Sequence, residues 1–558
     1  MSAGNATDEV QSGDRFSVDP NSATAEIPMP WRAARSAGSA DSGSPARDAA
    51  AHPPVGTTET PAPVAAAEPR EPVEAGGSPG TRVWWRAPAV LPLVSGALAF
   101  AVVLIGLGRR QIWRDELATL DAARLRLGEL YDLVQHRDLV LLPYYLGMHF
   151  WVRLFGDSEV ALRLPSAIAV AVAAALTTVQ GRMLYGPRVG LLAGALVGLL
   201  PTVTRYGQEA RPYGLVIAAV ALAGVFVVRG TQRHSRAVWA WYAASLALAG
   251  YLHLIALVVL VAHGVLVALH ARGTRRWQPV AWWLGATAAG LAALSPLVLL
   301  SAGQRGQIAW IKPVPPAELS DWVLGLPGSI GVGGVLLGLA ALGCAGGGRR
   351  VAYLVCWALG PLALLWALTP VMLLFTERYL LFVLPAWCLL AAAGVQVVAR
   401  QLTTLTVAVP VFVLLVGLST HVAVRAPVTQ FEPDLRSVAA VIERQARPGD
   451  LLAFTGPFPW WASDSVRYYL PEHPRLGEAF QAVEGQAKPT YGSACAEGRC
   501  LNTRARIWLV NTKPASYKIS SYAGMKPEVE EMLRARFVVT HVDRFSDVSV
   551  SLLTPRPR

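Results

Sequence analysis

The sequence predicts an all-α polytopic membrane protein that carries a small α/β domain at its C-terminal end. Of the 558 residues, 53% are hydrophobic and only 15% are charged, and uncharged stretches recur at lengths close to the roughly 17–25 residues that cross a bilayer. After residue 424 the chain turns polar, and its hydrophobic pattern changes to short strands that alternate with helices. We therefore expect a transmembrane domain, 83–424, followed by an α/β domain, 425–558.

The first 82 residues differ from both of these regions. They are rich in Ala, Pro, Ser and Gly, poor in large apolar residues, and net acidic. Such a segment cannot bury enough apolar surface to offset the entropy lost on folding, so 1–82 is predicted to be a disordered tail. It is not predicted to be a signal peptide, because the first apolar stretch begins too late.

Eleven membrane-spanning helices are predicted in the region that follows. Soluble proteins seldom contain so many helices in succession that are apolar on all sides. The longest stretch, 237–271, is interpreted as two helices that are interrupted near Gly250–His253. The stretches are 87–108, 164–181, 189–204, 212–228, 237–271, 277–304, 322–348, 351–376, 379–399 and 401–424.

The arginines between these stretches predict the orientation of the chain. With the N-terminus in the cytoplasm, the inner loops contain eleven arginines and no acidic residue, which agrees with the positive-inside rule. The tail is then cytoplasmic, and the C-terminal domain is extracytoplasmic. The arginines are Arg182, Arg188, Arg229, Arg233, Arg236, Arg272, Arg275, Arg276, Arg349, Arg350 and Arg400.

One apolar stretch has to be left out of this count. Residues 139–155 are apolar enough to cross, but a further crossing would invert every later loop. The stretch contains Arg153 and several aromatic residues that suit the headgroup zone, so we expect an amphipathic helix on the outer surface. The first outer loop then runs over 109–162.

The C-terminal domain has its own pattern. Helices are expected at 434–447 and 527–536, and strands at 451–455 and 506–510, with further strands within 537–553. The domain also contains Cys495 and Cys500. In an oxidising compartment this pair would close a small disulfide loop, but the sequence leaves equally open that both thiols are free.

The residues with chemical potential gather in the outer loops. The first loop begins with Trp113-Arg114-Asp115-Glu116, the second loop contains 204–213, and a later loop contains 376–379. A carboxylate can accept the proton of an attacking hydroxyl, and a guanidinium matches the oxygens of a phosphate. Carboxylates and arginines on one membrane face therefore favour transfer from a lipid-phosphate donor. The net charge of +12 does not indicate a nucleic-acid partner, because the arginines lie in short loops between spans.

An ordered set of motifs resembles a known family of enzymes. After Trp113-Arg114-Asp115-Glu116 come Tyr144-Tyr145, Arg163-Leu164-Pro165-Ser166, Tyr206-Gly207-Gln208-Glu209-Ala210-Arg211-Pro212-Tyr213 and Glu377-Arg378-Tyr379-Leu380. Over roughly 85–400 the chain is similar to the family 39 glycosyltransferases of the GT-C superfold, which include protein O-mannosyltransferases and the lipid A aminoarabinose transferase. The resemblance implies a GT-C-like fold and transfer of a sugar, mannose above all, from a polyprenyl-phosphate carrier.

The resemblance also implies roles for individual residues. It makes Asp115 the general base and Glu116 a positioning or stabilising partner. The charges favour Arg211, Arg378 and Arg205 as ligands of the donor phosphate, and the substrate-binding candidates are Glu209, Tyr213, Tyr144, Tyr145 and Glu377. Each has a structural alternative: the acidic pair could cap a helix, Glu209 could pair with Arg211, Arg205 could anchor the chain at the interface, and Glu377-Arg378 could cap a span.

The predicted function is thus that of an inverting glycosyltransferase in the plasma membrane. Its partners would be the lipid-linked sugar and an acceptor outside the cytoplasm, which could be a protein, a lipoglycan or a wall glycan. The sequence indicates no certain cofactor and no metal site; it leaves a divalent cation possible but gives no support for one. The alternative is a transporter or lipid flippase, but such proteins keep ionisable residues near the middle of the membrane, and here they lie at its faces.

Overall fold

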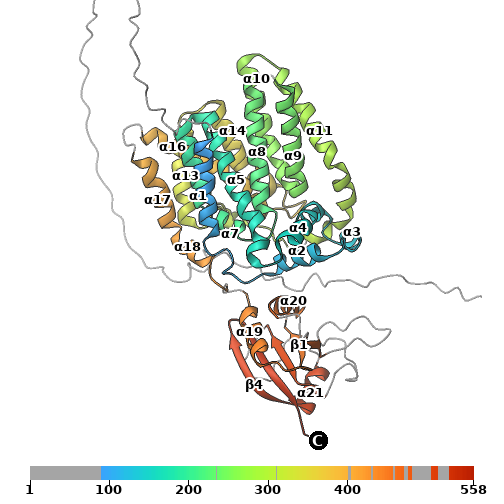
Figure 1. Cartoon of the computed structure of the whole chain (residues 1–558). Coiled ribbons are helices and arrows are strands. Elements are labelled where there is room, and N and C mark those ends of the chain that lie inside the picture. The colour runs from blue at the N-terminus through green and yellow to red at the C-terminus, as the bar shows by residue number, and fades with distance from the viewer. Residues whose placement is uncertain are drawn as a thin grey trace, which may run out of the picture.

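The computed structural model describes residues 89–557 except for 234, 309–310, 400–403, 429–431, 457–458, 471–475, 480–503 and 513–526. A long helical bundle stands at one end of the molecule and a small sheet domain at the other (Figure 1). This is the fold class that the sequence predicts: mostly helical, with several apolar helices and a small C-terminal sheet. The predicted disordered tail and the pair Cys495 and Cys500 lie outside the described residues.

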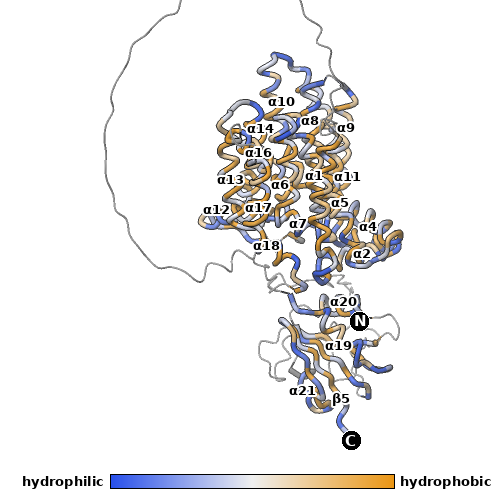
Figure 2. The backbone as a smooth tube through the Cα atoms, turned by 60° about the vertical axis from the view of Figure 1, so that its left-hand side comes forward, coloured by the Kyte–Doolittle hydropathy of each residue, from blue (hydrophilic) through white to orange (hydrophobic). Residues whose placement is uncertain are grey.

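The bundle contains most of the helices of the chain. Hydrophobic residues dominate along these helices, hydrophilic residues gather at the far tip of α10, and the two kinds are mixed in the sheet domain (Figure 2). The helices are α1 (Val90–Leu104), α5 (Glu159–Tyr185), α6 (Pro187–Leu199), α7 (Pro201–Gly207), α8 (Tyr213–Gln232), α9 (Arg236–Leu252), α10 (Leu260–Thr274), α11 (Gln278–Ser301), α12 (Leu319–Gly325), α13 (Ile330–Cys344), α14 (Gly348–Ala367), α15 (Glu377–Leu380), α16 (Leu384–Ala399), α17 (Leu405–Val416) and α18 (Leu418–Ala423).

Six of the helices in the described residues are long and apolar enough to cross a membrane, and eight crossings result if each of two bent pairs counts as one. Three shorter apolar helices, Val90–Leu104, Leu139–Phe155 and Leu405–Val416, fall below that length. The predicted number of eleven spans therefore stays a prediction. The predicted interruption of 237–271 is confirmed, since α9 ends at Leu252 and a 3-10 turn, Leu254–Val259, leads into α10.

Prolines explain where the helices depart from the predicted stretches. Pro201 separates α6 from α7, and the two helices meet at 64°. The helical segments Pro316–Gly325 and Ile330–Cys344, which lie on either side of Pro327, meet at 86°. The stretch 351–376 was expected to be helical to its end, but α14 stops at Ala367, shortly before Pro370. A proline lacks the N–H that would continue the helical ladder, and it disfavours helical geometry at the residue before it.

The first loop folds into a layer of short helices at one end of the bundle. It consists of α2 (Arg114–Arg124), α3 (Leu127–His136) and α4 (Leu142–Phe155), which Figure 1 places beside the lower ends of α8 and α11. Their buried side chains, including Tyr144, Tyr145 and Met148, form an apolar core separate from that of the bundle. On α4, Phe150, Leu154 and Phe155 are exposed, as expected of an amphipathic helix.

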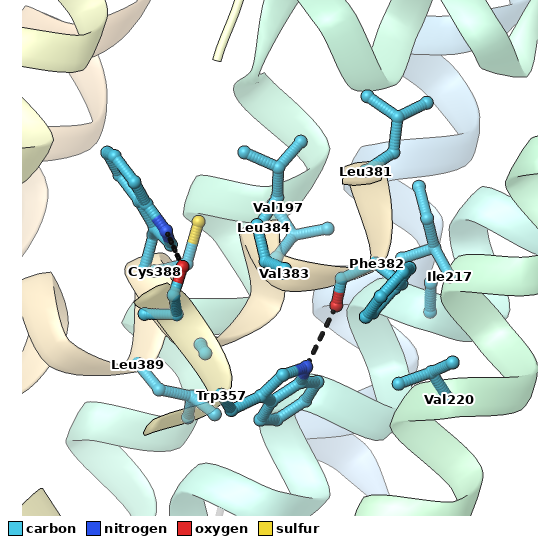
Figure 3. Packing of buried hydrophobic residues seen from close by; sticks show 14 of the residues in the cluster. Val197, Ile217, Val220, Trp357, Leu381, Phe382, Val383, Leu384, Cys388 and Leu389 are labelled. Atoms are coloured by element: carbon cyan, nitrogen blue, oxygen red, sulfur yellow. Dashed lines mark hydrogen bonds between the residues drawn. The ribbon is translucent and has the colours of Figure 1, made fainter. Parts of the chain in front are cut away.

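The bundle core fixes the segment that carries Glu377 and Arg378. The 3-10 turn Leu381–Val383 interrupts the helix between α15 and α16, just before Pro385, which cannot donate to a carbonyl one turn back. The indole N–H of the buried Trp357 on α14 donates to the Phe382 carbonyl at 3.1 Å, and apolar side chains of α6 and α8 surround the pair (Figure 3). The turn is thereby held in place at the end of the bundle nearest α2.

The C-terminal domain is a five-stranded sheet with helices on both faces. Its strands β1 (Leu451–Thr455), β2 (Gly477–Glu478), β3 (Ile507–Asn511), β4 (Phe537–Phe545) and β5 (Val548–Pro555) lie in the order β2-β1-β3-β5-β4. β1 pairs with β2 and β3 in parallel, and the remaining pairs are antiparallel. One core lies under α19 (Leu435–Gln445) and α20 (Pro459–Tyr469), and another under α21 (Pro527–Arg536).

The predicted elements of this domain are confirmed with small shifts at their ends. The strand 451–455 and the helix 527–536 have the predicted bounds, and the helix predicted at 434–447 spans Leu435–Gln445. Asp434 caps the latter by accepting the Ser437 N–H at 3.0 Å. The helix α20 was not predicted.

Candidate active site

Asp115 lies in the first turn of α2 and forms the centre of a cluster of arginines. Its Oδ2 accepts a hydrogen bond from Arg378 Nη1 at 3.0 Å, and its Oδ1 lies 3.6 Å from Arg114 Nε. Arg211 Nη1 reaches the backbone carbonyl of Asp115 at 3.5 Å. The side chain of Asp115 is 17% exposed, so the carboxylate lies at the wall of the site and remains accessible.

The surroundings of Asp115 keep it ionised. Burial by itself would raise the pKa of this carboxyl, but the positive charges of Arg211, Arg378 and Arg114 outweigh burial and hold the pKa below its usual value. The N-terminal end of α2 also favours a negative charge at this position. At neutral pH the carboxylate is therefore a proton acceptor.

Glu116, although next to Asp115 in the chain, has a different environment. Its side chain is 1% exposed and forms a two-pronged ion pair with Arg163 of α5, from Nε to Oε1 at 2.8 Å and from Nη2 to Oε2 at 2.7 Å. Glu116 Oε1 also accepts the Ala210 N–H at 2.9 Å. Both carboxylate oxygens are thus occupied by protein groups, which ties α2 to α5 and to the loop before α8.

Arg163 extends this network to the strip that leads into α2. Its Nη1 donates to the carbonyls of Leu107 and Arg110 at 2.9 Å each, and its Nη2 donates to the carbonyl of Gln111 at 3.1 Å. Residues 105–113 form no regular helix or strand, so their backbone groups depend on such partners. Arg163 therefore fixes the path of the chain into the site.

Arg211 lies between Asp115 and the tyrosines of the first loop. Burial would lower the pKa of its guanidinium, but Asp115 and the surrounding tyrosines raise it well above its usual value, so the group stays charged. Its backbone carbonyl accepts the Ser166 hydroxyl at 3.0 Å, which fixes the loop. Tyr144 is buried with no hydrogen-bond partner for its hydroxyl among the described residues, and the Tyr145 hydroxyl donates to Asp138 at 3.2 Å.

Glu209 and Arg205 belong to a second, deeper group of charges. Glu209 Oε1 lies 3.4 Å from Arg205 Nε and 3.5 Å from Arg110 Nη1, and its side chain is 1% exposed. Burial raises the pKa of this carboxyl against the opposing effect of the two arginines. Arg110 in turn bonds Glu432 at 2.6 Å. The expected alternative pair of Glu209 with Arg211 is not the one that forms.

Aromatic rings line the remaining side of the site. The Tyr206 hydroxyl donates to Glu377 at 3.4 Å, and the rings of Tyr206 and Tyr213 meet edge to face at 5.3 Å. The ring of His253, at the break between α9 and α10, lies 4.5 Å from that of Tyr379. Flat aromatic surfaces beside a charged cluster suit a sugar, whose C–H faces pack on rings.

The fold thus gathers the predicted residues from four separate segments. Asp115, Arg211, Arg378 and Tyr213 lie together. Tyr144 and Tyr145 lie near Arg211, and Tyr206 and Glu377 lie near Arg378. Sequence reasoning missed the parts that Arg163, Arg110 and Glu432 play. For Arg163 a signal existed, because a charge at the start of a long apolar stretch needs a partner; for Glu432 there was none.

Within the described residues no group of three His, Cys, Asp or Glu side chains is placed to hold a metal ion. A cavity of about 610 Å³ lies away from the site, between α1, α6, α16 and α17. Its lining is almost wholly apolar and includes Arg188. It shares no residue with the cluster around Asp115.

Comparisons with known proteins agree with the resemblance in the motifs. Residues 142–299 match a family model described as dolichyl-phosphate-mannose-protein mannosyltransferase. A comparison with curated protein sequences finds no significant match.

Two solved structures of one protein share the fold. The structure of ArnT from Cupriavidus metallidurans bound to undecaprenyl phosphate is 14% identical, with a TM-score of 0.53 over 82% of this chain and 97% of that chain. Its apo state is 15% identical with the same TM-score and coverage. The apo oligosaccharyltransferase of Archaeoglobus fulgidus is 12% identical, with a TM-score of 0.45 over 81% of this chain and 72% of that chain. The expected similarity to GT-C glycosyltransferases is confirmed by the family match and by the fold shared with ArnT.

Proposed function

We propose that this chain is a membrane glycosyltransferase that moves a sugar from a polyprenyl-phosphate carrier to a hydroxyl acceptor. The observation that carries the proposal is the ionised, partly exposed Asp115 beside Arg211 and Arg378 at one end of an apolar bundle. The bundle suits the prenyl chain, the arginines suit the phosphate, and the carboxylate suits the acceptor. The family match over 142–299 and the shared fold with ArnT support the same reaction class.

The reaction is a single displacement with inversion. Asp115 accepts the proton of the acceptor hydroxyl while the hydroxyl oxygen forms a bond to the anomeric carbon. The bond between that carbon and the phosphate oxygen breaks, and the polyprenyl phosphate leaves with the electron pair. The sugar passes through a state with oxocarbenium character, which the nearby carboxylate stabilises.

The arginines have two tasks in this reaction. Arg211 and Arg378 pair with the phosphate and stabilise the negative charge that develops as the phosphate departs. Arg378 donates to Asp115 at 3.0 Å. A phosphate that draws Arg378 away leaves Asp115 with fewer positive neighbours and beside a new anion, and both changes raise its pKa. Donor binding would thus convert Asp115 into a stronger base.

Two neighbouring groups support this centre. Glu116 is a positioning residue, because both of its oxygens are engaged by Arg163, Ala210 and Trp113. The ion pair of Arg205 with Glu209 stabilises the loop between α7 and α8. Tyr213, Tyr144, Tyr145 and Glu377 border the space in which the sugar and acceptor would meet.

The sugar is proposed to be mannose, in keeping with the description of the matched family. Its acceptor is proposed to lie outside the cytoplasm, as a protein hydroxyl, a lipoglycan or a wall glycan. The first test is to incubate membranes containing the protein with a panel of radiolabelled polyprenyl-phosphate sugars and to follow the label into lipid, protein and polysaccharide fractions. We expect label from the mannose donor to pass into one class of product, and to stay in the unreacted donor lipid in membranes without the protein. Failure of every donor would refute the reaction class.

The proposed orientation places the site outside the cytoplasm and the arginine loops inside. Single cysteines at Asp157 and at Arg188 test it, because the Asp157 side chain is 47% exposed, Arg188 is exposed, and the two positions lie beyond opposite ends of α5. A membrane-impermeant thiol reagent added to intact cells should label the cysteine at 157 and not the one at 188. The reverse pattern would place the site and the C-terminal domain in the cytoplasm.

A further inference from the structure

The C-terminal domain is bound to the strip that leads directly into Trp113-Arg114-Asp115-Glu116. Gln111 is the main contact: its N–H donates to the Pro427 carbonyl at 3.0 Å, its Nε2 donates to the Pro433 carbonyl at 2.8 Å, and its Oε1 accepts the Leu435 N–H at 3.1 Å. The next residue, Ile112, donates its N–H to the Tyr469 hydroxyl at 2.7 Å. A strip without regular secondary structure is thus held by residues more than 300 positions later in the chain.

Arg436 and Tyr469 reinforce these contacts. Arg436 of α19 donates to the carbonyls of Arg109 and Arg110, at 2.9 and 3.2 Å, and forms an ion pair with Glu159 at the start of α5. Tyr469 of α20 also donates to Glu159. The strip therefore lies between Arg163 on its inner side and the C-terminal domain on its outer side.

A second connection passes through buried charges. Glu432, 1% exposed, bonds Arg110 at 2.6 Å, and Arg110 Nη1 lies 3.5 Å from Glu209 Oε1. Glu209 immediately precedes Ala210, whose N–H bonds Glu116. A change at Glu432 therefore reaches both sides of the site, through the strip before α2 and through the loop before α8.

We infer that the C-terminal domain completes the active site, and that Glu432 and Tyr469 are positioning residues for Asp115. The domain then contributes to catalysis by holding the segment that carries Asp115. The inference rests on the proposed function for its effect on turnover, but the mechanical link from the domain to the strip can be measured without any substrate.

The cleanest variant is Tyr469→Phe, because it removes one hydroxyl and keeps the packed ring. It leaves the Ile112 N–H without its partner, whereas Arg436 still pairs with Glu159. Glu432→Gln removes the charge that Arg110 faces, and Glu432→Asp keeps the charge with a shorter reach. The matched control is Glu530→Gln, which breaks the pair of Glu530 with Arg534 on α21, in the same domain but away from the bundle.

Two measurements on the purified full-length protein test the inference. In hydrogen exchange, deuterium uptake of a peptide that covers 109–117 should rise in Tyr469→Phe and in Glu432→Gln, rise less in Glu432→Asp, and stay unchanged in Glu530→Gln. In sugar transfer, kcat should fall about tenfold to a hundredfold in the first two variants with little change in the donor KM, since small misplacements of a reacting group cost about that much.

The outcomes separate the two proposals. Unchanged exchange and unchanged kcat in Tyr469→Phe and Glu432→Gln would overturn the inference, and so would a rise in donor KM at constant kcat. Increased exchange of 109–117 in a protein that transfers no sugar from any donor would refute the proposed function while the link from the domain to the strip stands.

Discussion

The two ends of the helix bundle use arginine in opposite ways. At one end, in the connections from α5 to α6, α8 to α9, α10 to α11 and α13 to α14 and in the helix ends beside them, nearly all the arginines are exposed, and no carboxylate lies among them. At the other end Arg110 and Arg163 are buried, Arg378 is largely buried, and each forms an ion pair with a carboxylate. Exposed arginines in short loops favour a topology. Buried arginines need a partner to offset their desolvation, so their carboxylates mark a structural network or a site.

Within the second end a further distinction separates Asp115 from Glu116. Asp115 is accessible and is held by arginines that a phosphate could draw away, whereas Glu116 is sealed against Arg163. Adjacent residues on a helix point about 100° apart, so one faces the site and the other faces α5. The predictions below test these contrasts.

The largest effect is expected at Asp115. Asp115→Asn keeps the size of the side chain but cannot accept a proton, so transfer should fall about 10²–10⁴-fold while expression and folding are retained. The control is Asp157→Asn, an exposed carboxylate of the same loop that pairs with Arg124. Rates are measured in purified membranes with the labelled donor. Near-normal transfer by Asp115→Asn would remove this residue from the mechanism.

The buried ion pair should dominate stability. Arg163→Met leaves Glu116 buried without its partner and removes the donor of three backbone carbonyls. The free energy of unfolding should therefore fall by about 3–5 kcal/mol. Arg188→Met at the opposite end should change stability by less than about 0.5 kcal/mol. Thermal unfolding of the purified protein in detergent compares the two. Adding Glu116→Gln to Arg163→Met should recover part of the loss, and a double variant no better than the single one would contradict the pairing.

The affinity for the lipid-phosphate donor should depend on the arginines beside Asp115 and not on those at the opposite end of the bundle. Arg211→Lys and Arg378→Lys keep the charge but lose the forked geometry, so donor affinity should fall, and the Ala variants should lose about 10–150-fold. Arg229→Ala, at the exposed end, is the control and should leave the donor KM unchanged. Donor saturation curves for Arg211→Ala and Arg378→Ala that overlay the wild type would show that neither residue holds the phosphate.

The smallest expected effect is a shift in pH dependence. In the free protein the pKa of Asp115 is held low by Arg211, Arg378 and Arg114 against burial, so the base form persists to acidic pH. Arg378→Gln removes one of these charges, and the pKa must rise. The acid limb of kcat/KM should therefore move to higher pH in Arg378→Gln. Superimposable acid limbs for the two proteins would mean that Arg378 does not control the ionisation of Asp115.

Much of the fold could be predicted from the sequence, because the signals that specify it are local. Runs of apolar residues predicted the helices of the bundle, and the break near His253 follows from the residues around it. Short apolar runs predicted β1 and β3. Where the prediction failed, as at Pro327 and Pro370, a local signal was present, but the apolar run around it continued and concealed the break.

The candidate residues of the site were also visible in the sequence, as carboxylates and arginines beside apolar stretches. Their arrangement was not. Arg378 meets Asp115 from 263 positions away, Glu116 meets Arg163, and Glu209 pairs with Arg110 and Arg205 in place of Arg211. Composition and spacing give the type of chemistry, but a charge chooses its partner by distance and burial in three dimensions.

The sequence by itself thus determined an apolar helical bundle, a polar α/β domain and a set of residues suited to transfer from a lipid phosphate. Only the tertiary structure decided that Asp115 is accessible while Glu116 is sealed, and that Glu432 and Tyr469 of the C-terminal domain bond the strip before α2. The physical reason is that periodicity and hydropathy act over a few turns of chain, whereas buried polar groups must find partners wherever the fold brings them.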